Sequence, residues 1–218
     1  AEVATIFFRM LTDDARDRNW SQTNDFTDVP ETAWYNNAIS TLANMGILSG
    51  DPDGSFRPDD SITRAEFTKI AVSFFDETGD YVDGTYSDVS GSAWYADFID
   101  AAVDLGLIEG YPDGTIRPQA SITRAEACTI VNRTLGRVPD KDHLLPEDEM
   151  RVWPDNSDTD VWYYAQIQEA TNSHDYEWIG EEGDQIENWT DKLADRDWAA
   201  LEDEWSDANS APGGEVVD

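Results

Sequence analysis

Apolar residues recur at helical spacing in short runs, and polar turn sequences separate these runs. Between Trp34 and Met45 the spacing predicts a helix, and Gly46 suits the position just after a helix C-terminus. Asp51-Pro52-Asp53-Gly54 has the composition of a turn. A second helix is predicted after Ser61-Ile62, with an apolar face made of Phe67, Ile70, Ala71, Phe74 and Phe75.

This helix, loop, helix pattern occurs twice. A shift of 60 positions places Trp34-Tyr35 on Trp94-Tyr95 and the segment from Ser61 to Glu66 on the segment from Ser121 to Glu126. One such unit cannot bury its apolar face alone, so neighbouring copies must pack together. The sequence therefore predicts a mainly all-α fold of tandem helix-loop-helix repeats.

Two partial copies flank the full repeats. Ala1 to Ile6 matches Ala65 to Ile70, which predicts that the chain begins inside an earlier repeat, with an apolar stripe of Val3, Ile6, Phe7, Met10 and Leu11. Trp153-Pro154-Asp155 and Trp162 resemble the opening of a repeat, but no glycine-rich turn and no Thr-Arg-Ala-Glu segment follow them. The expected organisation is a truncated repeat at 1–20, full repeats at 26–79 and 86–138, a degenerate segment at 151–205, and an acidic tail or linker at 206–218.

The composition is strongly acidic, with 47 acidic and 14 basic residues and a formal charge of −33 among 218 residues. Such a charge argues against nucleic acid, because phosphates would be repelled, and against an anionic membrane surface. No apolar run approaches the roughly 20 residues that span a bilayer, so no membrane span is expected.

The Thr-Arg-Ala-Glu segments have the spacing of a capping box, in which Thr63 and Glu66, or Thr123 and Glu126, close the start of a helix. Arg64 and Arg124 then fall at the first helical position, where the helix dipole disfavours a cation. Two explanations remain open. Each arginine binds a carboxylate or phosphate beside free helix amides, or it forms a salt bridge to an acid of another repeat.

The aromatic residues that open the repeats also have two interpretations. Trp34 and Trp94 are either core anchors or walls for a sugar ring. In the second case Asp28 and Asp88 would accept hydrogen bonds from sugar hydroxyls. The glycines that precede the turns, Gly50 and Gly110, allow close approach of a ligand or of backbone.

The pattern resembles the S-layer homology family. The residues that carry the resemblance are Phe26-Thr27-Asp28-Val29, Trp34, Gly46-Ile47, Gly50 to Pro58, Ile62 to Glu66, and their second copy from Tyr86 to Glu126. In all, the resemblance covers residues 1–135 and touches the last segment only at its start.

The resemblance implies helical lobes, usually three, around a central bundle, in an extracellular protein of a bacterial cell wall or S-layer. It implies binding of a secondary cell-wall polysaccharide, often pyruvylated, in clefts between repeats. Arg64 and Arg124 would be the anion contacts. The same resemblance extends the site to Asp28, Asp88, Trp34, Trp94, Gly50 and Gly110.

An enzyme is not predicted. Acidic residues are abundant, but no pair stands out with the separation that a glycosidase needs. His143 and His174 are not spaced as metal ligands, and neither has a nucleophile motif beside it, so His174 is expected to be a turn or packing residue. No cofactor or metal is predicted, although the oxygen-rich segments 51–54 and 155–160 keep calcium as an alternative.

The sequence thus predicts a non-catalytic anchor that binds cell-wall polysaccharide. Two alternatives stay open. The chain could be a surface-lattice module that associates with copies of itself, or the binding part of a larger glycan-active enzyme.

Overall fold

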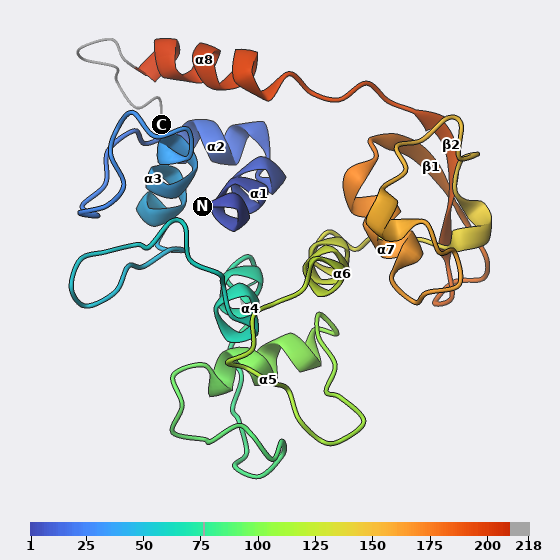
Figure 1. Cartoon of the computed structure of the whole chain (residues 1–218), viewed down its shortest axis with the longest axis horizontal. Helices are drawn as coiled ribbons and strands as arrows, with labels where there is room; N and C mark the ends of the chain where they lie inside the picture. Colours follow the sequence, from blue (N-terminus) through green and yellow to red (C-terminus); the bar gives the residue numbers. More distant parts are fainter. Residues whose placement is uncertain (76, 210–218) are drawn as a thin grey trace. The chain divides into compact units, whose positions relative to one another are not determined.

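A computed structural model describes residues 1–75 and 77–209, and it is mainly helical as expected (Figure 1). Its α-helices are α1 (Glu2–Met10), α2 (Asp13–Asn19), α3 (Asn36–Asn44), α4 (Arg64–Val72), α5 (Ala96–Asp104), α6 (Arg124–Thr134), α7 (Tyr164–Thr171) and α8 (Trp198–Asn209). The remaining elements are the 3-10 helices η1 (Lys141–His143) and η2 (Pro154–Asn156), and the strands β1 (His174–Ile179) and β2 (Ile186–Lys192). None of the described helices has the length and apolar character needed to cross a membrane.

The chain divides into two compact units. Of the described residues, one unit contains 1–61 and 196–209, and the other contains 62–75 and 77–195. In both, a helix of the Thr-Arg-Ala-Glu type packs against the first helix of the following segment: α1 on α3 in one unit, and α4 on α5 and α6 on α7 in the other. This pairing is the physical consequence of units that cannot cover their own apolar faces.

The capping boxes are confirmed at α4 and α6. The Thr63 hydroxyl accepts from the Glu66 amide at 3.2 Å, and the Glu66 carboxylate accepts from the Thr63 amide at 2.8 Å. Thr123 and Glu126 repeat the arrangement at 3.3 and 2.9 Å. Both arginines therefore occupy the first helical position, as the sequence predicts.

The predicted apolar stripes need two corrections. In α1 the buried residues are Ala4, Phe7, Phe8 and Leu11, whereas Ile6 is 43% exposed. Residues at i, i+3, i+4 and i+7 share one face of a helix. The buried set follows this spacing from Ala4, one position after the predicted start at Val3. In the second repeat helix, α4 ends at Val72, so Phe74 and Phe75 lie beyond its C-terminus.

Helix α8 belongs to the first unit. Its Trp205 ring lies 6.4 Å from Phe8 and 5.9 Å from Trp20, centre to centre, and the fully buried Arg16 guanidinium lies 4.4 Å from the Trp205 ring centre. The helix lies across the α1–α3 group in Figure 1. It includes residues 206–209, which the sequence analysis assigned to the tail, and residues 210–218 fall outside the described part.

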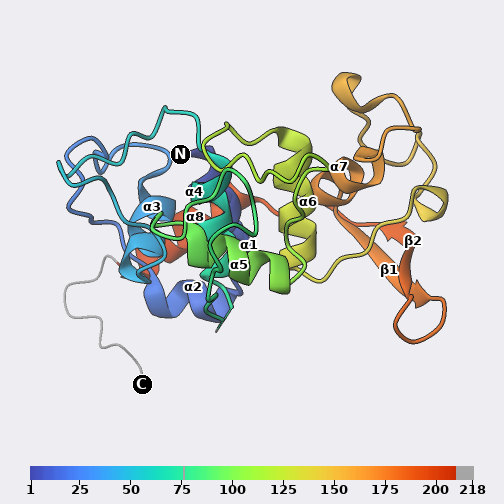
Figure 2. The same ribbon diagram turned by 90° about the horizontal axis from the view of Figure 1, so that it is seen from below.

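The degenerate segment departs from the repeat after α7. An antiparallel hairpin of β1 and β2 replaces the second helix, with a bulge between Asp175 and Tyr176 (Figure 2). These strands are not predicted from the sequence. A separate small core forms here from Leu145, Met150, Tyr164 and Trp189.

Candidate functional site

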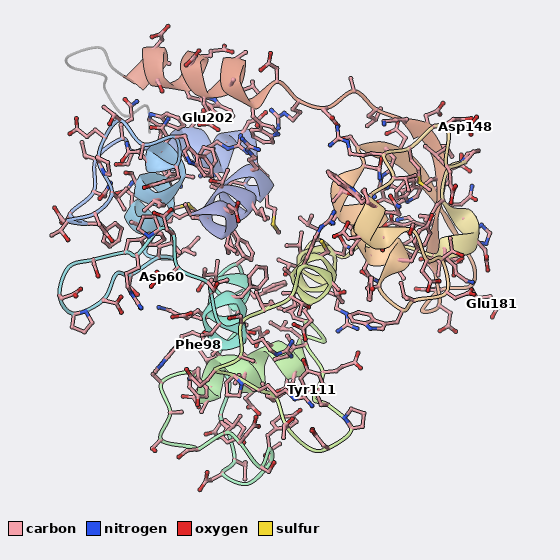
Figure 3. The ribbon with its side chains drawn as sticks, in the orientation of Figure 1. Asp60, Phe98, Tyr111, Asp148, Glu181 and Glu202 are labelled. Carbon is pink, nitrogen blue, oxygen red and sulfur yellow. The ribbon has the colours of Figure 1, made fainter. Side chains whose placement is uncertain are left out.

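The Arg64 side chain is enclosed by the following repeat. Its Nη1 lies 2.6 Å from Glu126 Oε1, and its Nε donates to the Ile116 carbonyl at 2.9 Å. The guanidinium carbon lies 5.1 Å from the ring centre of Tyr111, which Figure 3 labels on the loop after α5. Only 8% of the Arg64 side chain is exposed. Of the two explanations left open by the sequence, this geometry corresponds to the inter-repeat salt bridge.

The backbone at the start of α4 is also occupied. The Arg64 amide donates to the Ala120 carbonyl at 2.9 Å, and the Ala65 amide donates to the Pro118 carbonyl at 3.0 Å. The expectation of free helix amides beside Arg64 is therefore wrong, because the glycine-rich loop supplies acceptors. The first unit repeats the contact, since the Ala1 ammonium donates to the Pro58 carbonyl at 2.5 Å.

Glu126 connects the arginine to the loop. It accepts a short hydrogen bond from the Tyr111 hydroxyl, in addition to the capping bonds from Thr123. Burial would raise the pKa of Glu126, but the hydrogen bonds from Tyr111 and Thr123 and the charge of Arg64 outweigh it and lower that pKa. The ionised carboxylate is thus the stable form inside this contact.

The second motif has a different environment. Arg124 is 38% exposed and pairs through Nη1 with Asp155 Oδ2 at 2.5 Å, while Asp155 is itself 61% exposed. The guanidinium carbon lies 4.8 Å from the ring centre of Trp153. The hydrogen bond from Arg124 lowers the pKa of Asp155.

The backbone at the start of α6 is open. Across residues 1–75 and 77–209, no oxygen accepts a hydrogen bond from the amides of Arg124 or Ala125. The reason is visible in the sequence, because no glycine-rich loop follows in the degenerate segment. A partly exposed guanidinium beside two unused helix amides is suited to a carboxylate or phosphate.

Asp28 and Asp88, which occupy equivalent positions in the two repeats, each hold a loop in place. Asp28 accepts from the Phe56 and Arg57 amides, both at 2.8 Å, and Asp88 accepts from the Ile116 and Arg117 amides at 2.9 and 2.7 Å. The Phe56 bond contributes most to lowering the pKa of Asp28. Arg57 and Arg117 have φ near +56°, so each aspartate holds a loop residue in a strained backbone region.

Gly50 and Gly110 are required by close approach within the chain. A Cβ at Gly50 would lie 2.6 Å from Phe26 Cε1 and 2.6 Å from the Ser55 carbonyl oxygen. A Cβ at Gly110 would lie 2.6 Å from Tyr86 Cε1. The residues that come close are the opening aromatics of each repeat and, at Gly50, loop backbone.

The tryptophans are not core anchors. Trp34 is 63% exposed and Trp94 is 55% exposed, and the equivalent Trp162 of the degenerate segment is 67% exposed. Among the described residues, the ring contact of each is an edge contact with the tyrosine that follows it, at 5.3 to 5.4 Å between centres. Their exposed rings suit stacking against a sugar. Trp162 was not among the predicted site residues, although its match to Trp34 and Trp94 was the available signal.

A buried charged cluster was also missed. Glu169, His174 and Glu187 bring potential metal-ligand atoms within 4.8 Å of one another. Arg137 already lies among them, with Nη2 2.7 Å from His174 Nε2 and Nε 2.7 Å from Glu187. His174 begins β1 and stacks on Trp189 at 3.7 Å, so it is a packing residue and not part of a turn. The guanidinium supplies the positive charge that these carboxylates need.

The oxygen-rich segments use their carboxylates locally. Asp51 pairs with Arg57 at 2.6 Å, and Asp53 accepts from the Ser55 hydroxyl at 2.7 Å. Asp155 is the partner of Arg124. Calcium binding at these segments stays an untested alternative.

Comparison with known families finds one family at two segments, and each segment lies largely within one of the two full repeats. The S-layer homology domain family matches residues 25–68 and residues 85–128. The two matches end within α4 and α6, shortly after the two Thr-Arg-Ala-Glu segments.

Several curated relatives share this region. A cellulosome-anchoring protein of Acetivibrio thermocellus is 35% identical over 191 residues, which cover 85% of this chain and 41% of that protein. A surface layer protein of Brevibacillus choshinensis is 34% identical over 53% of this chain and 11% of its own length. Endo-1,4-beta-xylanase A of Thermoanaerobacterium saccharolyticum is 39% identical over 46% of this chain and 9% of its own length. The chain thus spans less than half the length of each of these relatives.

Proposed function

We propose, from the premise that this chain belongs to the S-layer homology family, that it anchors a protein by binding an anionic cell-wall polysaccharide at Arg124. S-layer homology domains are non-catalytic modules that attach proteins to the cell wall, and the chain is extracellular and associated with the wall. We propose further that the polysaccharide carries an acidic group and that this chain has no catalytic activity of its own.

The observation that carries the proposal is the open environment of Arg124. An exposed ion pair is worth only about 0–1 kcal/mol, so a ligand carboxylate can replace Asp155 at small cost. The unused amides of Arg124 and Ala125 would then donate to the same group. A pyruvyl ketal, which the family resemblance suggests, carries such a carboxylate.

The other predicted residues are proposed to act within their own repeats. Trp34 and Trp94 would stack on sugar rings through their exposed faces. Asp28 and Asp88 would keep the conformation of the loop in each repeat, through hydrogen bonds to its backbone amides. Arg64 is proposed as a positioning residue, since its contacts fix the loop that follows α5.

The acidic surface opposes an anionic polymer only at long range. At physiological salt the Debye length is about 8 Å, so most of the formal charge of −33 is screened from a bound carboxylate. The local arginine therefore decides the contact, and added salt should weaken it only moderately.

Co-sedimentation with bacterial cell walls tests this function. Wild type should sediment with native walls and remain in solution with walls stripped of secondary polysaccharide. Arg124→Ala should weaken binding about tenfold, the effect of one charge-assisted contact of about 1.4 kcal/mol. Arg133→Ala is the matched control, because Arg133 lies on the same helix, is 34% exposed and pairs with the exposed Glu109.

Binding that survives both stripping and Arg124→Ala would contradict the proposal. The second candidate would then be favoured, a module that associates with its own copies, as the surface layer relative suggests. The mass in solution at several protein concentrations would separate a monomeric anchor from a self-associating module.

A further inference from the structure

A hollow of about 280 Å³ lies beside Trp162 in the degenerate segment. Its walls come from two stretches of the same unit, residues 139–141 after α6 and residues 159–166 at the start of α7. Ligand sites in proteins occupy about 300–1,000 Å³, so this volume suits one small ring and not a long chain. Arg124 is not among the lining residues, so the hollow is separate from the proposed anion site.

One wall is aromatic. Trp162 is 67% exposed, and within the part of the chain that the structure describes its ring contact is an edge contact with Tyr163 at 5.4 Å between centres. Trp162 stands two residues before α7 begins at Tyr164. An exposed indole offers the apolar surface on which the C–H face of a pyranose packs.

The rim supplies both donors and acceptors. Lys141 and Asp160 are half or more exposed, and their charged groups are 3.6 Å apart. Gln166 is oriented by Asn132, whose Nδ2 donates to Gln166 Oε1 at 2.8 Å and so leaves the Nε2 group as the donor for a ligand. Carboxylate, ammonium and amide groups around one aromatic ring are complementary to sugar hydroxyls.

The polar rim is specific to the degenerate segment. Gln166 stands four residues after Trp162, whereas the full repeats have Ala38 and Phe98 at that place. Ala38 is buried in its unit. The equivalent position is therefore apolar in both full repeats and carries an amide in the degenerate segment, where the hollow lies.

The local charge selects the kind of sugar. Asp140 and Asp160 outnumber Lys141 in the lining, so an acidic sugar would be repelled. We propose that this hollow is a second binding site, which takes a neutral pyranose through stacking on Trp162. The inference rests on the proposed function, because the neutral sugar would be part of the same wall polymer.

Saturation-transfer NMR on the full chain tests the site, with methyl glycosides of glucose, galactose and N-acetylglucosamine as probes and methyl glucuronide as the acidic probe. At least one neutral glycoside should receive saturation, and Trp162→Ala should weaken its binding at least fivefold. Gln166→Ala should weaken it less. Trp178→Ala is the matched control, because Trp178 is 43% exposed in the same unit and does not line the hollow.

Neutral glycosides that do not bind, or that bind equally to wild type and Trp162→Ala, would overturn the second site. Stronger transfer to methyl glucuronide that Trp162→Ala abolishes would also overturn it. Arg124→Ala separates the two proposals, since it should weaken wall binding about tenfold and leave binding of the neutral glycoside unchanged. If wall binding needs Arg124 and no neutral glycoside binds, only the second site fails. If the neutral glycoside binds and Arg124→Ala leaves wall binding unchanged, only the proposal of the anion site fails.

Discussion

Two copies of Thr-Arg-Ala-Glu stand at the start of α4 and α6, and their arginines lie in different environments. Arg64 is 8% exposed and is held by Glu126, the Ile116 carbonyl and the Tyr111 ring. Arg124 is 38% exposed and has the exposed Asp155 as its only ion-pair partner among the described residues. The four residues are identical, so the motif itself does not decide whether its arginine is structural or available.

The following segment makes the difference. After α4, a complete repeat places the carbonyls of Pro118 and Ala120 on the helix amides. After α6, the degenerate segment turns into a hairpin and leaves the amides of Arg124 and Ala125 unused by the described chain. Loss of a loop in one repeat therefore leaves uncovered the helix amides that a complete repeat covers.

The largest expected difference is in stability. Arg64→Ala should destabilise the second unit by about 3 kcal/mol, because it leaves Glu126 enclosed without its cation. Arg124→Ala should cost less than about 1 kcal/mol, as expected for an exposed pair. Urea unfolding followed by tryptophan fluorescence would measure both. The double variant Arg64→Ala/Glu126→Gln should recover part of the loss, and equal losses for the two single variants would break the comparison.

Acid should distinguish the two carboxylate partners. The pKa of Glu126 is below its ordinary 4.5, so the carboxylate binds its proton less readily in the folded state than in the unfolded state. Its contribution to stability is complete above the unfolded pKa and is lost as pH falls through the lower folded pKa. Glu126→Gln should flatten the stability profile below about pH 4.5. Asp155→Asn should change that profile much less, since the pair of Asp155 with Arg124 is exposed and screened.

A smaller effect is expected on wall binding. Asp155 competes with the ligand carboxylate for Arg124, so Asp155→Asn should strengthen binding roughly two- to fivefold, the equivalent of an exposed ion pair. Co-sedimentation at several wall concentrations would measure the shift. Weaker binding by Asp155→Asn would mean that Asp155 contacts the ligand, and the anion site would have to be revised.

Local features could be predicted from the sequence, and distant contacts could not. The capping boxes of Thr63 and Thr123 follow from spacing within four residues. The Arg64 environment depends on a carbonyl 52 residues away, which no local pattern encodes. The exposure of Trp34 and Trp94 likewise depends on how neighbouring repeats pack, and it excludes one of the two interpretations that the sequence left open, the core anchor.

The hairpin was missed for a different reason. His174 to Ile179 is only six residues long, and its burial pattern does not alternate cleanly, so period-two patterning gives a weak signal. Its position is fixed by Arg137, which pairs with Glu169 and Glu187 at 2.8 and 2.7 Å. Such a cluster joins residues from three segments and becomes visible only in the fold.

The most direct test observes both arginines in one sample. Side-chain Nε–Hε NMR signals, assigned with Arg64→Lys and Arg124→Lys variants, would be followed while purified acidic wall polysaccharide is added. The Arg124 signal should shift and saturate at polymer concentrations that leave the Arg64 signal in place. A shift of Arg64 with no change at Arg124 would contradict the account, because the enclosed arginine would then be the one that binds.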